Sequence, residues 1–340
     1  MFESYKEEVT FNEQRGAEEM DPQNEFYQED MEESFKKDIT SIGRRLIGYM
    51  LVFFLFATAG QQAALDKALE NAVSTEDFYG IWGVGLFIGA SLGLLIWSVS
   101  KKFPMKRIYE HVAPRKMTIQ SFAILSASLF GIRFISKFIL AGLEKLLFEM
   151  GIPATLVADT REDITASIIF VLYLGVMGPV VEEFIFRGFI GYRLERYGKV
   201  FTILFTSLIF SLIHNNISQE VFTFMAGIVF AYVAIEYGFQ WAVLFHMMNN
   251  FLFAVVVDIY LGRTMIFGDF SIVKILDLVG FITLVLVLIL KRKEIKEYID
   301  VNRGFHGIAH ITFTRVTIIL YIIYLVYRTF APYFLLYLHF

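Results

Sequence analysis

The chain contains a series of apolar runs, each about as long as a bilayer is thick, and they limit what it can fold into. A helix of about 20 apolar residues spans the hydrocarbon core of a membrane. Such runs follow one another from residue 46 onward. Because 56% of the 340 residues are hydrophobic, so much apolar surface does not fit inside one water-soluble core. We therefore expect an all-α fold, a polytopic membrane bundle.

The apolar runs predict eight transmembrane helices and a possible ninth. The eight are expected at residues 46–65, 79–100, 117–138, 164–189, 200–214, 221–235, 241–261 and 272–290. The possible ninth covers residues 311–330, where Arg315 and Arg328 interrupt the apolar sequence. An interfacial hairpin is the alternative for this last segment.

Basic residues gather in alternate loops. They lie within residues 36–45, 101–116, 193–199 and 291–296, whereas the loops between these are neutral or acidic. Cytoplasmic loops of membrane proteins carry an excess of Lys and Arg. The pattern predicts a multi-pass protein of the cell membrane with a cytoplasmic amino terminus.

The chain divides into three parts by charge and hydropathy. Residues 1–34 carry twelve acidic against two basic side chains, so we expect residues 1–42 to be an acidic, mostly disordered cytoplasmic tail. A docking arm for a basic partner is the alternative for this tail. Residues 43–292 should form the transmembrane bundle, and residues 293–340 a cytoplasmic segment with the possible extra helix. The chain has no cysteine, which excludes a thiolate metal site and a Cys nucleophile.

The sequence EEFIFR at residues 182–187 places two carboxylates and a guanidinium inside an apolar run. Each ionised group at membrane depth costs about 2.5 to 3.5 kcal/mol on insertion scales, so the segment is a functional-site candidate. On a helix Glu183 and Arg187 share a face and can pair, whereas Glu182 points about 100° away. Pro179 lacks a backbone donor and can open the helix to water. Glu182 is therefore expected to be the unpaired carboxylate.

Two histidines lie in or at the end of apolar runs, His214 in FSLIH (210–214) and His246 in HMMNN (246–250). A lone intramembrane histidine is more often a hydrogen-bonding residue between helices, but several polar groups in lipid converge on one another. His246 and Asn250 share a helix face. A carboxylate beside an imidazole can activate water, and a second imidazole with an amide can bind an oxyanion, which together permit peptide hydrolysis. Glu182, His214 and His246 are also ordinary zinc ligands, and the sequence does not separate the two chemistries.

The motifs EExxxR, FxxxH and HxxxN occur in this order on successive apolar segments. Together they resemble the CPBP intramembrane proteases, the family of type II CAAX prenyl endopeptidases and of bacteriocin-processing or bacteriocin-immunity proteins. The resemblance covers residues 164–261. It implies a glutamic endopeptidase in which Glu182 and His214 activate water and His246 and Asn250 form the oxyanion hole. It also implies that Glu183 with Arg187 supports the site, with no cofactor, zinc being the lesser possibility.

Two other functions stay open at this point. One is a catalytically inactive membrane scaffold or a binding protein of the bacteriocin-immunity type. The other is a proton-coupled transporter that uses the Glu and His groups as a relay, although no pair of broken helices in repeated halves is visible. The expected partners are membrane lipid and a peptide or membrane-protein substrate, not nucleic acid. The oligomeric state is not indicated.

The expected spans place the two water-activating residues at different depths. Glu182 lies about 18 residues into a span that runs toward the cytosol, and His214 about 14 residues into the span that returns. We therefore expect the helix of Glu182 to be long and tilted, continuing past Gly188 toward Arg193 or Arg196. Glu182 and His214 would then meet inside the membrane.

Overall fold

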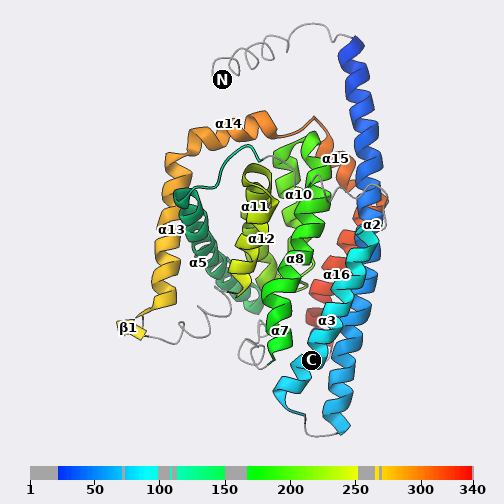
Figure 1. Ribbon diagram of the computed structural model, residues 1–340, viewed down its shortest axis with the longest axis vertical. Coiled ribbons are helices and arrows are strands. Elements are labelled where there is room, and N and C mark those ends of the chain that lie inside the picture. The colour runs from blue at the N-terminus through cyan, green and yellow to red at the C-terminus, as the bar shows by residue number, and fades with distance from the viewer. Residues whose placement is uncertain are drawn as a thin grey trace.

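The computed structural model describes residues 22–70, 73–98, 108, 113–149, 167–251, 265–267 and 270–338. Within these ranges the regular secondary structure is helical apart from a short antiparallel hairpin, β1 (Met265–Phe267) and β2 (Phe270–Ser271). The helices pack side by side as a bundle, and one helix, α14 (Arg292–Asn302), lies across an end of it (Figure 1). The all-α class predicted from the apolar runs is confirmed.

The helices follow the apolar runs of the sequence closely. They are α2 (Pro22–Glu70), α3 (Thr75–Ser98), α5 (Ile119–Glu149), α7 (Ile168–Leu172), η2 (Tyr173–Met177), α8 (Gly178–Glu183), η3 (Phe184–Gly191), α9 (Tyr192–Leu194), η4 (Glu195–Tyr197), α10 (Lys199–Leu212), α11 (Ile217–Tyr237), α12 (Phe239–Met247), α13 (Ile272–Leu290), α15 (Ile308–Phe313) and α16 (Val316–Leu338).

Six helical segments are long and apolar enough to cross a membrane: Glu29–Glu70, Thr75–Ser98, Ile119–Leu146, Ile168–Tyr197, Gln219–Tyr237 and Ile272–Leu290. Two other predicted spans correspond to shorter apolar helices, Lys199–Leu212 and Val316–Ala331. The predicted span 241–261 begins in α12, and its residues beyond 251 lie outside the described ranges. The chain is therefore a multi-pass membrane protein, but the count of eight or nine spans is not confirmed.

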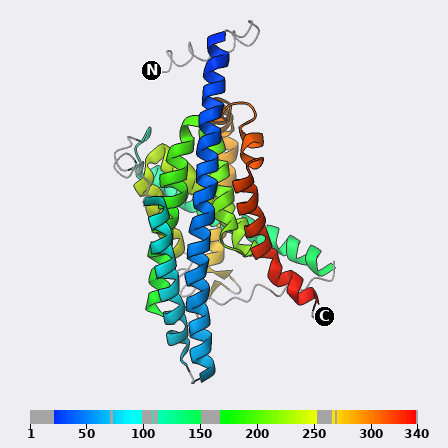
Figure 2. The same cartoon turned by 90° about the vertical axis from the view of Figure 1, so that its right-hand side faces the viewer.

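The amino-terminal helix corrects one expectation. Residues 22–42 were expected to be part of a disordered tail, but they are the first turns of α2, which projects beyond the bundle at its amino-terminal end (Figure 2). Phe35, Ile39 and Ile42 are buried against the bundle, and the Phe35 ring meets Tyr197 and Phe201 edge to face. This apolar stripe is spaced at helical intervals, and its burial explains why the segment is ordered. Residues 1–21 lie outside the described ranges.

Glycines allow two pairs of neighbouring helices to approach closely. A Cβ atom at Gly85 of α3 would lie 2.6 Å from the Phe56 carbonyl oxygen of α2. A Cβ atom at Gly280 of α13 would lie 2.5 Å from the Ala127 carbonyl oxygen of α5. Small residues at such contacts are typical of helix packing in membranes. These helix pairs flank the segment that carries the EEFIFR motif (Figure 1).

The described parts of the basic loops meet at one end of the bundle, where two buried carboxylates hold them. Arg193 and Arg196 lie 2.6 Å and 2.7 Å from the Asp38 carboxylate. A second carboxylate, that of Glu236, contacts Arg115 at 3.4 Å, Lys199 at 2.9 Å and the Tyr298 hydroxyl at 3.0 Å. The positive-inside rule requires these loops to share one side. Which side faces the cytosol stays a prediction.

Candidate active site

Two π-helical turns, η2 and η3, flank the short helix α8 that carries both glutamates. In η2 the Gly178 N–H donates to the Tyr173 carbonyl, five residues back. The next bond of this kind would join residue 179 to the Leu174 carbonyl, but Pro179 has no N–H. The Asn250 amide Nδ2 donates to this carbonyl instead, at 3.1 Å. The proline that was expected to open the helix thus also fixes Asn250 in place.

The Glu183 carboxylate is the centre of a buried ion cluster. Its Oε1 atom accepts from Arg187 Nη1 at 3.0 Å and from His246 Nδ1 at 2.8 Å. Arg187 Nη2 donates to the Gly227 carbonyl at 3.1 Å. The Glu183, Arg187 and His246 side chains are each at most 2% exposed. The predicted pairing of Glu183 with Arg187 is confirmed, whereas the bond from His246 to Glu183 was not predicted.

Glu182 differs from its neighbour because it makes no hydrogen bond to the described part of the chain. Its Oε2 atom lies 3.6 Å from His246 Nε2, and 18% of its side chain is exposed. This distance is too long for a direct hydrogen bond. Glu182 is therefore an unbonded carboxylate beside the enclosed cluster, as its position on the helix predicted.

His214 lies just beyond the end of α10 and has a defined tautomer. Its Nδ1 atom is 3.1 Å from the Phe210 carbonyl oxygen and 3.2 Å from that of Ser211. Carbonyl oxygens only accept hydrogen bonds, so Nδ1 carries the proton and Nε2 of the neutral ring has a lone pair. The charge of Glu182 acts on this ring. His214 therefore presents an acceptor nitrogen within the electrostatic reach of Glu182.

A tight turn at Gly198 brings these residues to the same depth. Glu182 lies sixteen residues before Gly198, and His214 lies sixteen residues after it. The helical segment Ile168–Tyr197 and α10 run antiparallel from this turn, where Gly198 has φ 146°. Equal helical lengths from a common turn give similar depths. The expected continuation of the Glu182 helix past Arg193 is confirmed, and it removes the conflict in depth.

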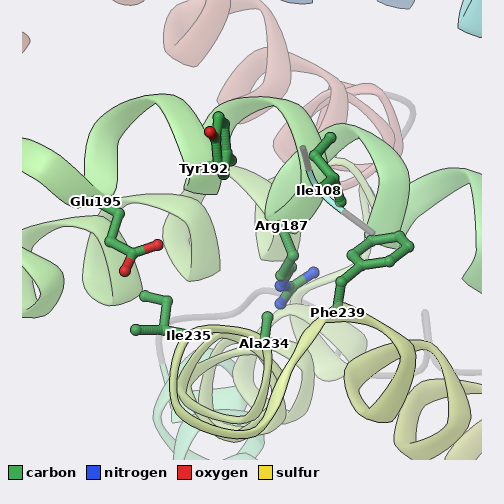
Figure 3. Close-up of a pocket in the computed structure, with 7 residues that line it drawn as sticks. All are labelled: Ile108, Arg187, Tyr192, Glu195, Ala234, Ile235 and Phe239. Atoms are coloured by element: carbon green, nitrogen blue, oxygen red, sulfur yellow. The ribbon is translucent and has the colours of Figure 1, made fainter. Parts of the chain in front are cut away.

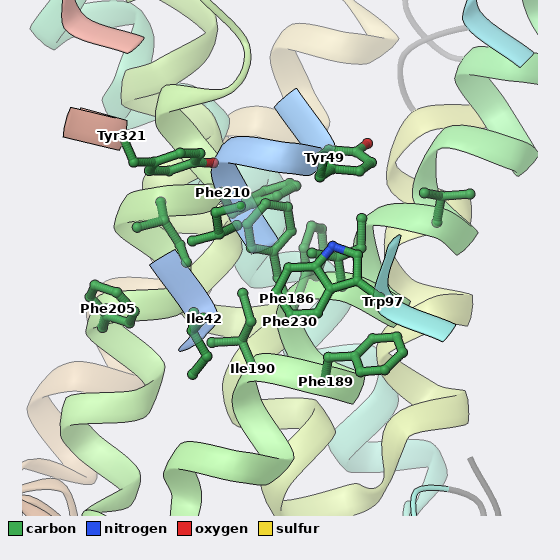
Figure 4. Packing of buried hydrophobic residues seen from close by; sticks show 14 of the residues in the cluster. Ile42, Tyr49, Trp97, Phe186, Phe189, Ile190, Phe205, Phe210, Phe230 and Tyr321 are labelled. Atoms are coloured by element: carbon green, nitrogen blue, oxygen red, sulfur yellow. The ribbon is translucent and has the colours of Figure 1, made fainter. Parts of the chain in front are cut away.

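Two phenylalanines join the charged groups into one site. The Phe210 ring lies 5.1 Å from the His214 ring and 5.4 Å from the His246 ring, and 4.4 Å from the Arg187 guanidinium carbon. The Phe230 ring stacks on His246 at 4.8 Å. Both rings are fully buried in the aromatic core (Figure 4). They cover the ion cluster with apolar surface on this side, which strengthens its electrostatic interactions.

The sequence identified Phe210 only as the first residue of the FxxxH motif, and it did not indicate that Phe230 packs on His246. The chain has 37 phenylalanines, so nothing in the sequence distinguishes Phe230 from the others. Gly227 was also missed. A Cβ atom there would lie 3.2 Å from both Arg187 Nη2 and Phe210 Cδ1. Gly227 lies within an apolar run, and nothing in that run indicated that its carbonyl binds Arg187.

A small pocket lies beside the Arg187 guanidinium. It has a volume of about 20 Å³ and is lined by Ile108, Arg187, Tyr192, Glu195, Ala234, Ile235 and Phe239 (Figure 3). The Nε atom of Arg187 is enclosed and has no partner. A volume of this size holds about one water molecule. The pocket is thus a place where one water can complete the hydrogen bonds of Arg187.

The fit of the site to zinc can be tested from its donors. Within the described ranges, no three His, Asp or Glu side chains are grouped so that they could hold a metal ion. The trio Glu182, His214 and His246, as it lies, is not such a group. As they lie, these donors are not arranged to hold zinc, and the absence of a cofactor stays a prediction.

Comparisons with known proteins agree with the motifs. Residues 163–252 match the family model of Rce1-like type II CAAX prenyl endopeptidases. The chain is 24% identical over 210 residues to the "Putative membrane peptidase YdiL" of Bacillus subtilis (strain 168), a match that covers 61% of this chain and 81% of the relative. No solved structure matches at a significant level. Residues 163–252, which contain all three motifs, thus resemble an Rce1-like type II CAAX prenyl endopeptidase domain, as the motifs predicted.

Proposed function

We propose that the protein is an intramembrane endopeptidase that depends on Glu182 and hydrolyses a peptide bond of a membrane-associated peptide or protein. The observation that carries this proposal is the unbonded Glu182 carboxylate, 3.6 Å from His246 Nε2 at the edge of an enclosed ion cluster. Maintaining such a group in a membrane is costly, which favours a chemical role over a structural one. The match to an endopeptidase family supports the same class of reaction.

Water activation is assigned to Glu182 and His214. A water molecule between them donates one hydrogen bond to the Glu182 carboxylate and the other to His214 Nε2, the nitrogen with the lone pair. Glu182 takes a proton as the water oxygen bonds to the carbonyl carbon of the substrate. When the C–N bond breaks, the same proton passes from Glu182 to the leaving amine. Glu182 ends the cycle as a carboxylate, ready for the next water.

The oxyanion is assigned to His246 and Asn250. Glu183 accepts from His246 Nδ1 and so turns Nε2 toward the site, where the Nε2–H of the protonated ring can donate a hydrogen bond to the oxyanion without transferring its proton. Asn250 donates one amide hydrogen to the Leu174 carbonyl and keeps the second. Both donors are held by the protein before substrate arrives, which is the condition under which such donors are effective. Glu183 and Arg187 act as supports that position His246.

The name of the matching family suggests the substrate class to test first. We expect wild-type protein in liposomes to cleave a fluorogenic farnesylated peptide that ends in a CaaX sequence. An apolar peptide of the same sequence without the prenyl group tests whether the lipid is needed. Replacing Glu182 with Gln should lower kcat by about 10² to 10⁴-fold, the contribution typical of a general base.

A matched control is Glu220→Gln, which alters a half-buried glutamate of α11 that bonds to Thr329, outside the site. This variant should keep the wild-type rate. Equal rates for wild type and Glu182→Gln would contradict the proposal. If folded wild-type protein cleaves neither peptide, the membrane scaffold or immunity-type binding protein becomes the better account.

A further inference from the structure

Two buried tyrosines lie near Glu182 and have no part in the mechanism above. Tyr173 is the first residue of η2, and Tyr49 lies on α2. Neither hydroxyl has a hydrogen-bond partner among the residues that the structure describes. The charge of Glu182 acts on both phenols. The phenol of a buried tyrosine usually has a hydrogen-bond partner, so an unbonded one near a reactive carboxylate calls for an explanation.

The Tyr173 ring lies close to Gly178. A Cβ atom at Gly178 would lie 3.8 Å from Tyr173 Cζ, the carbon that carries the hydroxyl. Gly178 and Glu182 are four residues apart on α8 and therefore share a face. The phenol thus lies over the face of α8 that carries Glu182, one turn before it.

Leu174, the residue after Tyr173, contacts Asn250, one of the two assigned oxyanion donors. The Leu174 carbonyl accepts from Asn250 Nδ2, so the residue that follows Tyr173 in the chain binds the side chain of Asn250. Phe87 of α3 packs against the Tyr173 ring at 5.6 Å and holds it from behind. Tyr173 therefore reaches the Glu182 face from the same segment that positions an assigned oxyanion donor.

We propose that the Tyr173 hydroxyl is a third donor to the oxyanion, beside His246 and Asn250. The inference rests on the proposed hydrolysis. A phenol carries its proton throughout the neutral range, unlike an imidazole Nε2, and it has no acceptor to give up when substrate binds. The hydrogen bond forms as the carbonyl oxygen becomes negative and is released when the carbonyl is restored. No proton is transferred, so Tyr173 is unchanged at the end of the reaction.

The test compares Tyr173→Phe with Tyr321→Phe, using the farnesylated fluorogenic peptide in liposomes. Tyr321 is a matched control because it is buried in the same core, on α16, and its enclosed oxygen has no partner (Figure 4). Loss of one oxyanion donor lowers kcat by about 10²-fold or more. We expect this loss for Tyr173→Phe with KM unchanged, and a rate close to wild type for Tyr321→Phe.

A second variant separates hydrogen bonding from packing. Difluorotyrosine at position 173 keeps the shape of the ring and is a stronger donor than tyrosine, so kcat should return to the wild-type value or exceed it. A kcat for Tyr173→Phe equal to wild type overturns the inference but leaves the proposed hydrolysis intact, provided that Glu182→Gln shows the loss of kcat expected above. A difluorotyrosine variant as slow as Tyr173→Phe also overturns it. Absence of cleavage by wild type overturns both proposals.

Discussion

Two of the buried acids of the bundle, Asp277 and Glu183, each bind two basic side chains, but they differ in how their carboxylate oxygens are used. Asp277 of α13 uses one oxygen for Arg133, at 2.7 Å from Nε, and the other for Lys137, at 2.9 Å. Glu183 of α8 receives Arg187 and His246 on a single oxygen. Glu182 stands next to it without a hydrogen bond to the described residues.

The number of free hydrogen-bonding positions distinguishes the Asp277 cluster, which only holds helices together, from the Glu183 cluster, which we expect to serve the reaction. Both oxygens of Asp277 are engaged, and Lys137 leads to the surface, with 57% of its side chain exposed. The cluster ties α5 to α13 and leaves no group for a reaction. The cluster at Glu183 is enclosed throughout, and it orients an imidazole toward a second, unbonded carboxylate. A buried charge therefore indicates chemistry only when its partners leave some bonding capacity unused.

The largest expected effect on folding comes from removing the guanidinium of the site. Arg187→Ala leaves Glu183 as a buried charge that keeps only His246, and breaking a buried pair costs about 3 to 5 kcal/mol. Thermal unfolding in detergent should show a large fall in Tm, while Glu182→Gln should unfold like wild type. Similar losses in the two variants would contradict the division between a supporting and a reacting carboxylate.

Removing the carboxylate charge of the Asp277 cluster should lower the folding stability less than Arg187→Ala does. Asp277→Asn leaves Arg133 and Lys137 without their carboxylate, and we expect a cost of about 1 to 3 kcal/mol, because Lys137 can turn toward the surface. The kcat of the folded protein should stay at the wild-type value. A variant that unfolds normally but has lost its activity would show that the Asp277 cluster also serves the reaction.

The smallest expected effect is that of metal removal. The mechanism uses carboxylate, imidazole, amide and phenol groups, so exhaustive treatment with a chelator should leave kcat unchanged. Elemental analysis of active protein is the direct measurement. One mole of tightly bound zinc per mole of protein would make Glu182, His214 and His246 ligands, and the contrast between the two clusters would then need another explanation.

The sequence predicted those features of the site that depend on local helical spacing. The pairing of Glu183 with Arg187 and the separate direction of Glu182 follow from their positions on one helix. The bond from His246 to Glu183 joins residues 63 apart, and no periodicity in either segment indicates it. The roles of Phe210 and Phe230 depend on the same packing between helices. The catalytic roles themselves stay predictions.

Hydropathy was a better guide to which segments are helical than to where helices end. Residues 22–42 were expected to be disordered because twelve acidic residues lie between positions 1 and 34. The apolar stripe of Phe35, Ile39 and Ile42, which packs against the bundle, was not recognised in the sequence. The run at 200–214 is apolar enough for a span, but α10 ends at Leu212 and a turn follows it. Asn215 adopts φ 50° in that turn, a conformation that asparagine tolerates better than most residues.

The π-helical turn η2 makes the direction of the site depend on residue number as well as residue type. A π turn accommodates one residue more than an α turn, so deletion of a single residue within Tyr173–Met177 would restore an ordinary helix without shortening the bonded segment much. This deletion would leave the later side chains in phase with α7, because residue i+5 of a π turn takes the place of residue i+4 of an α turn. If all residues were kept and η2 became an ordinary α turn, every later side chain would instead rotate by about 100° relative to α7. Glu182 would then turn away from its neighbours on α10 and α12 with no change in composition. The direction of the reactive half of this helix relative to its lipid-facing start is thus set by the π turn, which accommodates one extra residue.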